Sequence, residues 1–236
     1  MSADVIIEAH NVTKEYTGKR GRIKAIENFD IVVKEGEFVI LLGPSGAGKT
    51  TVLNLLAGMD RPTKGEIILF KRNIKDLSEE ELAKLRNEKV GFIFQFFNLI
   101  DELTVLENVM VPLMVREIPE REIIARAEEL LSELKLIGKK FRYPKELSGG
   151  EQQRVAIARA LINEPEVIFA DEPVAQLDEQ TAQNVLNILV DIHKLGKTII
   201  LATASTALTN QLRRVATKVV HLERGHIVKV ETLRRL

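Results

Sequence analysis

The segment that most constrains the fold is a glycine-rich loop with an apolar run before it and a helical pattern after it. Residues 37–42 form a mostly apolar run of strand length, and residues 50–57 have apolar side chains at helical spacing before Gly58. The loop between them ends in Lys49 and Thr50. A strand, a glycine loop and a helix in this order indicate an α/β fold built on a parallel sheet.

The loop has the composition of a phosphate-binding site. Its glycines would let successive backbone N–H groups turn toward phosphate oxygens at the start of a helix, where the helix dipole favours anions. Lys49 would add a positive charge for the β- and γ-phosphates, and the Thr50 hydroxyl would bind Mg²⁺, which prefers oxygen ligands. A glycine turn without a ligand is disfavoured by the strand and the helix on either side. The nucleotide-binding residues predicted here are Gly43, Pro44, Ser45, Gly46, Ala47, Gly48, Lys49, Thr50 and Thr51.

Two carboxylates follow a second apolar run at residues 167–170. Asp171, at the end of the expected strand, would orient the ligands of Mg²⁺, and Glu172 would act as general base toward an attacking water. An acidic pair after a strand is often only a helix cap or a solvated turn. The phosphate-binding loop earlier in the chain favours the catalytic interpretation.

A third stretch, residues 147–154, reads Leu-Ser-Gly-Gly-Glu-Gln-Gln-Arg. Ser148 and Glu151 have the spacing of a capping box, so the simplest interpretation is a well-capped helix. That interpretation leaves Gly149 and Gly150 unexplained, because each glycine in a helical turn costs about 0.5–1 kcal/mol relative to Ala. Bare backbone at a helix N-terminus would permit the close approach of a γ-phosphate.

Composition narrows the classes of partner and compartment. The chain has 34 Lys and Arg against 34 Asp and Glu, so its net charge gives no reason to expect nucleic acid or an anionic membrane as a partner. It has no cysteine, which excludes disulfides and cysteine metal sites and suits a reducing compartment. No run approaches the roughly 18 apolar residues of a spanning helix, and the N-terminus lacks the pattern of a secretory signal. We therefore expect a cytoplasmic protein with a single domain.

Short segments rich in β-branched residues predict two groups of strands. An N-terminal antiparallel sheet is expected from the segments at residues 5–7, 23–26 and 29–33. Two buried strands of a parallel sheet are expected at residues 167–170 and 198–201, on either side of a helix over 179–195 that Gly196 would cap.

The part of the chain between residues 78 and 161 has a mostly helical pattern. Capping boxes begin at Ser78 and Thr104, and Pro119 opens an amphipathic run that ends near Gly138. We interpret this part as a helical subdomain inserted into one domain. Residues 1–94 and 157–236 would form the nucleotide-binding core with its antiparallel sheet, and residues 95–156 would form the helical subdomain.

In their order along the chain, the glycine loop, residues 147–154 and the acidic pair resemble the nucleotide motifs of the ATP-binding cassette (ABC) family. The resemblance covers essentially the whole chain and implies a RecA-like P-loop core with an N-terminal antiparallel β-subdomain and an inserted helical subdomain. It also implies an ATPase that uses ATP and Mg²⁺. In the family, the residues matched by Ser148, Gly149 and Gly150 close over the ATP held by the glycine loop of a partner subunit. The implied partners are thus a second copy or paired cassette and a separate transmembrane permease, with no nucleic acid, at the inner face of the cell membrane.

Three further site residues rest on this resemblance. Tyr16 stands where the family places the aromatic residue that stacks on adenine, although alone it would more often be a packing residue. Gln95 matches the glutamine that contacts Mg²⁺ and transmits closure to the membrane partner, with a solvated loop glutamine as the alternative. Asp178 matches the end of the D-loop, which crosses the dimer interface. The implied catalytic residues are Lys49, Gln95 and Glu172, and the implied metal ligands are Thr50, Gln95 and Asp171.

Within the family, residues 94–99 and 103–109 resemble the group that holds macrolide exporters, lipoprotein-release ATPases and the cell-division FtsE type. This leaves two functions open: a transporter subunit, or an ATP-gated switch that signals through a membrane partner without moving a substrate. A DNA-repair ATPase is disfavoured, because the segment between the glycine loop and residue 147 has no heptad repeat and no cysteine. A translation-type member is disfavoured as well, because it would carry two cassettes in one chain.

Two positions depart from the family pattern. Ala204 occupies the place of the switch histidine, which hydrogen-bonds the γ-phosphate and helps to hold Glu172 and the attacking water. A methyl group can do neither, so we expect ATP binding to be retained and hydrolysis to be slow. Ala175 stands where the family commonly has glycine, which puts the D-loop geometry in doubt because alanine adopts a positive φ less readily.

Overall fold

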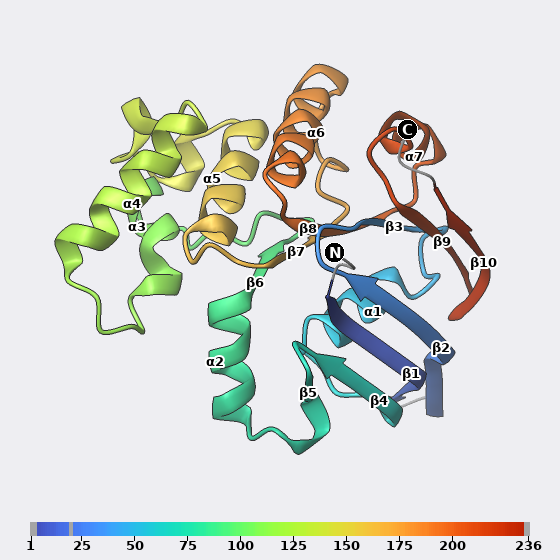
Figure 1. Cartoon of the computed structure of the whole chain (residues 1–236). Helices are drawn as coiled ribbons and strands as arrows, with labels where there is room; N and C mark the ends of the chain where they lie inside the picture. The colour runs from blue at the N-terminus through green and yellow to red at the C-terminus, as the bar shows by residue number, and fades with distance from the viewer. Residues whose placement is uncertain (1–3, 19–20, 234–236) are drawn as a thin grey trace.

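The computed structural model describes residues 4–18 and 21–233 and contains two sheets and a group of helices (Figure 1). The larger sheet has six strands and the smaller has four. In Figure 1 the smaller sheet lies below the larger one, and the helices between residues 105 and 161 lie to the left. This arrangement confirms the predicted α/β fold with an antiparallel N-terminal sheet.

The larger sheet has the strand order β10-β9-β3-β8-β7-β6. Its strands are β10 (His226–Thr232), β9 (Lys218–Glu223), β3 (Phe38–Leu42), β8 (Thr198–Thr203), β7 (Val167–Asp171) and β6 (Val90–Ile93). All neighbours pair in parallel except β9 and β10, which form an antiparallel hairpin. The carboxyl ends of β3, β7 and β8 therefore meet at one edge of the sheet, where ligands bind in open α/β folds.

The central strands are apolar throughout because both faces of the sheet are covered. Along β3, Val39 and Leu41 point into a core shared with the smaller sheet and α1 (Lys49–Leu56). The alternate residues Phe38 and Ile40 point into a second core with α5 (Gly149–Leu161), α6 (Glu179–Lys194) and α7 (Thr206–Leu212). The predicted strands at residues 37–42, 167–170 and 198–201 are confirmed within one to two residues.

The smaller sheet is antiparallel, in the order β2-β1-β4-β5. Its strands are β1 (Val5–Gly18), β2 (Gly21–Lys34), β4 (Lys64–Leu69) and β5 (Arg72–Asn73). Two predicted segments, 23–26 and 29–33, belong to the single strand β2. They were predicted as separate strands because polar residues lie between them. In the structure Asn28 adopts a positive φ of 50° at this point, and its N–H donates to the Thr13 hydroxyl at 3.3 Å, but the strand continues.

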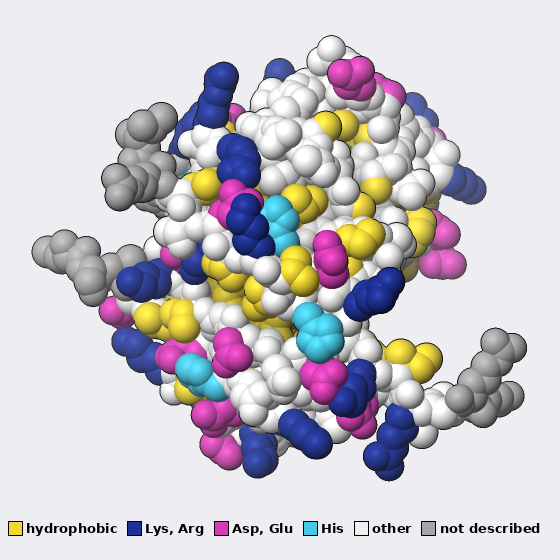
Figure 2. All heavy atoms as spheres, turned by 90° about the vertical axis from the view of Figure 1, so that its right-hand side faces the viewer, with side chains coloured by type: hydrophobic (Ala, Val, Ile, Leu, Met, Phe, Trp, Pro, Cys, Tyr) yellow, Lys and Arg dark blue, Asp and Glu magenta, His cyan; other side chains and the backbone are white. Residues whose placement is uncertain are grey.

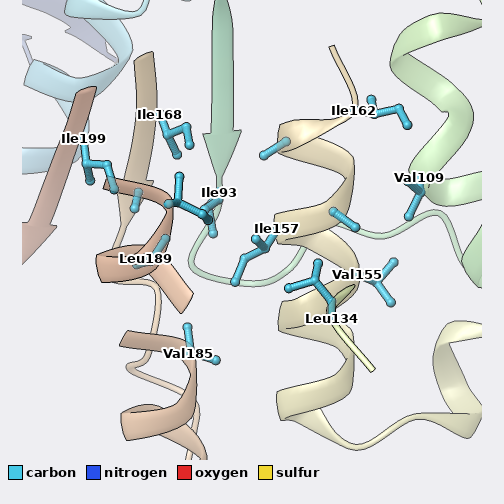
Figure 3. Packing of buried hydrophobic residues seen from close by; sticks show 14 of the residues in the cluster. Ile93, Val109, Leu134, Val155, Ile157, Ile162, Ile168, Val185, Leu189 and Ile199 are labelled. Atoms are coloured by element: carbon cyan, nitrogen blue, oxygen red, sulfur yellow. The ribbon is translucent and has the colours of Figure 1, made fainter. Parts of the chain in front are cut away.

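The remaining helices connect and cover these sheets. They are α2 (Glu79–Lys89), α3 (Val105–Met110) and α4 (Glu120–Glu133), with short 3₁₀ turns at Ile74–Asp76, Val111–Leu113, Ile137–Lys139 and Pro144–Glu146. Capping boxes begin at Ser78, Thr104 and Ser148, as the sequence predicts. Figure 3 shows α5 between two layers, with Ile157 pointing toward Ile93 of β6 and Val155 on its opposite side.

One expectation for the helical part was wrong. The amphipathic run from Pro119 ends at Glu133 and not near Gly138, because Lys135 takes the left-handed conformation with φ of 57° and the Leu136 N–H turns back to the Leu131 carbonyl. That cap is normally a glycine, so the sequence carried no stop signal there. The short strand β6 lies within this mostly helical segment, in the part assigned from the sequence to the nucleotide-binding core.

Charged side chains of both signs are interspersed over the face that includes β9 and β10 (Figure 2). Apolar side chains gather in a band across the middle of the same face. The neutral net charge thus corresponds, on this face, to local mixing and not to large opposed patches. Such a surface gives little electrostatic attraction for a polyanion.

Candidate nucleotide-binding site

The glycine loop leaves β3 and enters α1, and two of its glycines have backbone conformations that other residues rarely adopt. Gly46 has φ of 78° and Gly48 has φ of 98°. A Cβ at Gly48 would lie 2.6 Å from Ile26 Cδ1 and 2.8 Å from the Ala25 carbonyl oxygen. Gly48 is therefore required both by its φ and by the close approach of β2.

The loop is also joined to the hairpin between β9 and β10. The Gly225 N–H donates to the Ala47 carbonyl at 3.0 Å, and the Glu27 N–H donates to the Gly225 carbonyl at 2.9 Å. A Cβ at Gly225 would lie 2.6 Å from the Ala25 carbonyl oxygen. Two segments that are far from the loop in the sequence, β2 and the β9–β10 hairpin, thus hold it in place.

Lys49 begins α1 and is buried. Its Nζ donates to the carbonyl oxygens of Gly43, at 2.9 Å, and Pro44, at 3.1 Å, and lies 3.4 Å from Glu172 Oε1. A buried ammonium is costly unless it is paired, and these three oxygens satisfy it. The same contacts hold the positive charge inside the loop, next to the predicted general base.

Asp171 and Thr50 form the centre of the site. The Thr50 hydroxyl donates to Asp171 Oδ2 at 2.7 Å. Burial raises the pKa of the Asp171 carboxyl, and the nearby Glu172 raises it further, against the lowering effects of Thr50 and Lys49. Asp171 Oδ1 is buried and has no hydrogen-bond partner among the residues that the structure describes.

These residues fit a Mg²⁺ ion. They offer a carboxylate, a hydroxyl and the side-chain amide of Gln95, which lines the same cavity, and such oxygen donors are the ligands that Mg²⁺ prefers. The unpaired Oδ1 of Asp171 gives an independent reason, because a buried carboxylate oxygen without a partner is destabilising unless a cation balances it. Elsewhere in the described part of the chain, no group of three or more His, Cys, Asp or Glu side chains could hold a metal.

Glu172 follows Asp171 with a positive φ of 45°, which is uncommon for a residue with a side chain. Its N–H donates to the Ala202 carbonyl at 3.0 Å, so β8 helps to hold this conformation. The carboxylate faces a cavity of 520 Å³ next to the glycine loop. The residues that line this cavity are Ile23, Lys24, Ala25, Ser45, Gly46, Gly48, Lys49, Thr50, Thr51, Gln95, Glu172 and Arg224.

Four of these lining residues were not predicted. Ile23, Lys24 and Ala25 come from β2, and Arg224 comes from the turn of the β9–β10 hairpin. The position of Tyr16 was a usable signal for the first three, because Tyr16 and Ile23 are cross-strand partners. No signal pointed to Arg224, because the hairpin itself was not predicted.

Tyr16 does not line the cavity. Its hydroxyl donates to Asp60 Oδ2 at 2.9 Å, and Lys14 Nζ lies 5.0 Å from the centre of its ring. Nevertheless, Tyr16 is 42% exposed and is the cross-strand partner of Ile23, which lines the cavity. Its predicted contact with adenine remains a prediction.

The residues Ser148, Gly149 and Gly150 also lie outside this cavity, at the start of α5. A Cβ at Gly150 would lie 2.2 Å from Thr181 Cγ2 of α6, whereas at Gly149 the nearest atom would be Leu177 Cδ2 at 3.4 Å. The reasoning from the sequence left both glycines without a packing role, and for Gly150 this was wrong. Close packing of α5 on α6 explains it within the chain.

Asp178 caps the N-terminus of α6 and is likewise outside the cavity. Its side chain accepts a hydrogen bond from the Thr181 N–H at 3.0 Å, and hydrogen bonds from Thr181 lower the pKa of its carboxyl. Ala175 lies three residues before Asp178. The expectation that an alanine here would disturb the D-loop geometry does not apply, because Ala175 does not have a positive φ; the nearby residue with a positive φ is Glu172.

Ala204 follows β8 directly and is exposed. It lines a second cavity, of 530 Å³, with Glu172 and the alanines 175, 182 and 207. It also lines a third cavity with Gly43, Pro44 and His221. The His221 ring is bound to Glu231 Oε1 at 2.7 Å, so a histidine lies near this position but has another partner.

The fold and the site define a P-loop nucleotide-binding protein with a RecA-like core. Residues 26–175 match the ABC transporter domain. The chain belongs to the ABC transporter family, whose cassettes bind ATP and are ATPases, and it is therefore an ABC-type ATPase. The family and the enzyme class predicted from the sequence are confirmed.

Related proteins share this organisation over nearly their whole length. An uncharacterised ABC transporter ATP-binding protein of Methanocaldococcus jannaschii, MJ1508, is 45% identical over 95% of this chain and 99% of its own. The lipoprotein-releasing system ATP-binding protein LolD of Aquifex aeolicus is 45% identical over 89% of this chain and 92% of its own. A dimeric, post-hydrolysis structure of the M. jannaschii cassette MJ0796 bound to ADP and Pi is 40% identical, with a TM-score of 0.88 over 97% of this chain and 99% of that one.

No helix in residues 4–18 or 21–233 has both the length and the apolar character needed to cross a membrane.

Proposed function

We propose that the chain is the ATP-hydrolysing subunit of an ABC transporter, that it dimerises around two ATP molecules, and that it drives a separate transmembrane permease. The observation that carries the proposal is the Thr50–Asp171 pair, with its unpaired carboxylate oxygen, next to the cavity that Thr50, Lys49 and Glu172 line. This arrangement combines phosphate binding, metal binding and a base. Such a subunit would work on the cytoplasmic face of the membrane.

Each residue has a task that its position supports. The N–H groups of the glycine loop and the Lys49 ammonium bind the phosphates, and Thr50, Asp171 and Gln95 hold Mg²⁺, which when bound neutralises charge on the β- and γ-phosphates. Glu172 accepts the proton of the attacking water. The Lys49 ammonium, whose Nζ lies 3.4 Å from Glu172 Oε1, forms an ion pair with this carboxylate.

Dimerisation follows from what one chain lacks. Ser148, Gly149 and Gly150 do not line the cavity of their own chain, and a Cβ at Gly149 would make only ordinary contact, with Leu177 Cδ2 at 3.4 Å, so packing within the chain does not explain this glycine. A second copy would supply these residues to the bound ATP. The dimeric state of the similar cassette MJ0796 supports this inference.

We test the dimer with the variant Glu172→Gln, which removes the base while keeping the shape of the side chain. In light scattering, E172Q with Mg²⁺ and ATP should have the mass of a dimer, and it should be a monomer without nucleotide. The control Lys49→Ala should stay monomeric in both conditions, because its phosphate site is lost. A monomeric E172Q with saturating Mg-ATP would rule out the proposed sandwich.

We propose further that hydrolysis is slow in this chain. Ala204 lies next to Glu172 in the second cavity and offers only a methyl group where a polar contact to phosphate and water is needed. Closing around ATP does not need that contact, so binding and dimerisation would be retained.

A second candidate is an ATP-gated switch that signals through a membrane partner without transport. The alanine at position 204 favours it, because a slow ATPase holds its ATP-bound state for longer. Purification with a permease that moves cargo would favour the transporter. The similarity to LolD supports the lipoprotein-release group as a place to look for that permease.

A further inference from the structure

The loop after Gln95 has an unusual backbone. Phe97 and Asn98 are consecutive residues with positive φ, 57° and 49°. The Asn98 N–H donates to the Phe96 carbonyl and closes a three-residue turn around Phe97. A bulky residue rarely takes this conformation, and a turn of this type is rare and strained. Something in the surrounding structure must hold it.

Arg159, in the last turn of α5, makes the contacts that hold this turn. Its guanidinium donates to the Asn98 carbonyl at 2.5 Å and to the Phe97 carbonyl at 2.7 Å. Burial lowers the pKa of this guanidinium, which nevertheless stays charged in proteins. None of the ion pairs between described residues includes Arg159. The partners of this half-buried charge are therefore the two backbone carbonyls.

The position of Arg159 connects two parts of the proposed machinery. Gln95, two residues before Phe97, lines the nucleotide cavity. The other end of α5 begins with Gly149 and Gly150. The helix is held firmly between them, with Val155 and Ile157 fully buried on its two sides (Figure 3). A displacement of α5 would therefore pull on the turn at Phe97 and Asn98.

We propose that Arg159 is a positioning residue for ATP hydrolysis, which couples the position of α5 to that of Gln95. This inference rests on the proposed function, since it takes Gln95 as part of the hydrolytic site. Arg159 does not touch the reacting atoms. It keeps the strained turn closed, and the closed turn fixes the direction from which Gln95 enters the cavity.

The far end of the same loop has a separate anchor. Asn108 of α3 accepts a hydrogen bond from the Ile100 N–H at 2.8 Å and donates to the carbonyls of Ile100, Leu103 and Thr104, each at 3.0 Å. Asn108 thus ties the loop to α3. Arg159 holds the residues nearest to Gln95, and only its loss should release them.

The test compares Arg159→Met, which keeps an unbranched apolar stem but removes all donors, with Arg159→Lys, which keeps one charged donor. Arg116→Met is the matched control, because the Arg116 guanidinium also donates to a side-chain oxygen and a carbonyl of one residue, Asn87, at 2.8 and 3.0 Å, away from the loop. Single-turnover hydrolysis and equilibrium ATP binding are measured on the full chain, with a melting curve for each variant.

We expect R159M to slow single-turnover hydrolysis by about 10-fold or more, since small misplacements of a catalytic group cost that much. ATP affinity should change by less than about 3-fold, because the phosphate loop is unaffected. R159K should recover part of the rate. R116M should melt at a lower temperature and hydrolyse ATP at the wild-type rate. Equal rates for R159M and wild type, or equal losses in R159M and R116M, would overturn the proposal.

A double-mutant cycle with Gln95→Ala separates this inference from the proposed function. If Arg159 acts through Gln95, the double variant should be no slower than Q95A alone. If both single variants are slow and their effects multiply, Arg159 acts elsewhere and the inference fails while the role of Gln95 stands. If Q95A alone hydrolyses ATP normally, the proposed role of Gln95 fails, and the coupling through it fails as well.

Discussion

The glycine loop before α1 and the glycines at the start of α5 look alike in the sequence but are built for different reasons. Before α1, Gly46 and Gly48 have positive φ, and the loop surrounds a cavity formed by its own chain. At the start of α5, Gly149 and Gly150 are helical, and Gly150 makes room for Thr181. Glycine near a helix N-terminus can thus mean an unusual backbone or a close neighbour, and only the structure separates the two.

The first region places Lys49 and Thr50 on a cavity of its own chain, whereas Ser148, Gly149 and Gly150 do not line that cavity. Lys49, Thr50 and Asp171 contact one another or the loop directly. Ser148 is occupied by the cap of α5, where its side chain accepts from the Glu151 N–H. Binding should therefore depend on the first region, and closure should depend on the second. The predictions below test this division.

The largest expected effect is on the rate of hydrolysis, through a change next to Glu172. Ala204→His should raise ATP turnover by about 10²–10³-fold, because it restores one preorganised polar contact near Glu172. ATP affinity should stay the same, and E172Q/A204H, which lacks the base, should dimerise with ATP as E172Q does. Steady-state phosphate release compared with E172Q/A204H, which lacks the base, is the measurement. An unchanged slow rate would remove the lost histidine as the explanation for slow hydrolysis.

Gly48→Ala should weaken ATP binding by about 100-fold, or about 2.8 kcal/mol. The added Cβ meets the Ala25 carbonyl and Ile26 Cδ1, and the φ of 98° adds strain of about 1–3 kcal/mol. Titration with a fluorescent ATP analogue measures the affinity. The variant G48A/I26V removes Ile26 Cδ1 and so relieves the side-chain contact. It should not restore the affinity, because the φ and the contact with the Ala25 carbonyl remain. Full recovery of the affinity in that variant would contradict the backbone argument.

Gly150→Ala should lower the free energy of unfolding by about 1–3 kcal/mol through overlap with Thr181 Cγ2. The second change Thr181→Ser removes that methyl group and should restore stability in denaturant titrations. The informative measurement is the ATP-dependent dimerisation of the triple variant E172Q/G150A/T181S. A restored dimer would mean that packing is the whole role of Gly150; a stable protein that no longer dimerises would mean that the partner's ATP also needs the bare backbone.

The smallest effect concerns the cap beside the second region. Because the pKa of Asp178 lies below its usual value of 3.8, its ionised cap stabilises the fold above that value, and the contribution is lost as pH falls through the lowered pKa. Asp178→Asn keeps a capping oxygen without a titrating proton. Its stability relative to wild type should rise as pH falls through this window. A difference that is constant with pH would contradict the assigned cause.

The sequence predicts the first region well because its signals are local. A buried strand, a glycine loop and a helix start lie within about twenty residues, and each was predicted. The acidic pair was also found, because Asp171 ends a strand that is apolar on both faces. Gly150, Arg224 and the end of α4 were not understood, because they depend on Thr181, on an unpredicted hairpin and on a left-handed Lys135.

The short strand β6 shows a different limit. Its four residues follow α2 directly and become a strand through parallel pairing with β7, more than seventy residues later. Gly91 is needed there because a Cβ would lie 2.6 Å from the Ala160 carbonyl of α5. Such a contact leaves no local pattern in the sequence, so tertiary structure determined this element.

The contact of Gly225 with the glycine loop has a consequence for biosynthesis. Residues 43–50 leave the ribosome early, but the hydrogen bond that fixes Ala47 comes from a hairpin near residue 225. A nascent chain that has passed residue 60 holds the full phosphate-binding motif and still lacks a wall of its pocket. We therefore expect newly made chains to gain ATP affinity late, when the β9–β10 hairpin emerges, so that incomplete chains would not compete for nucleotide.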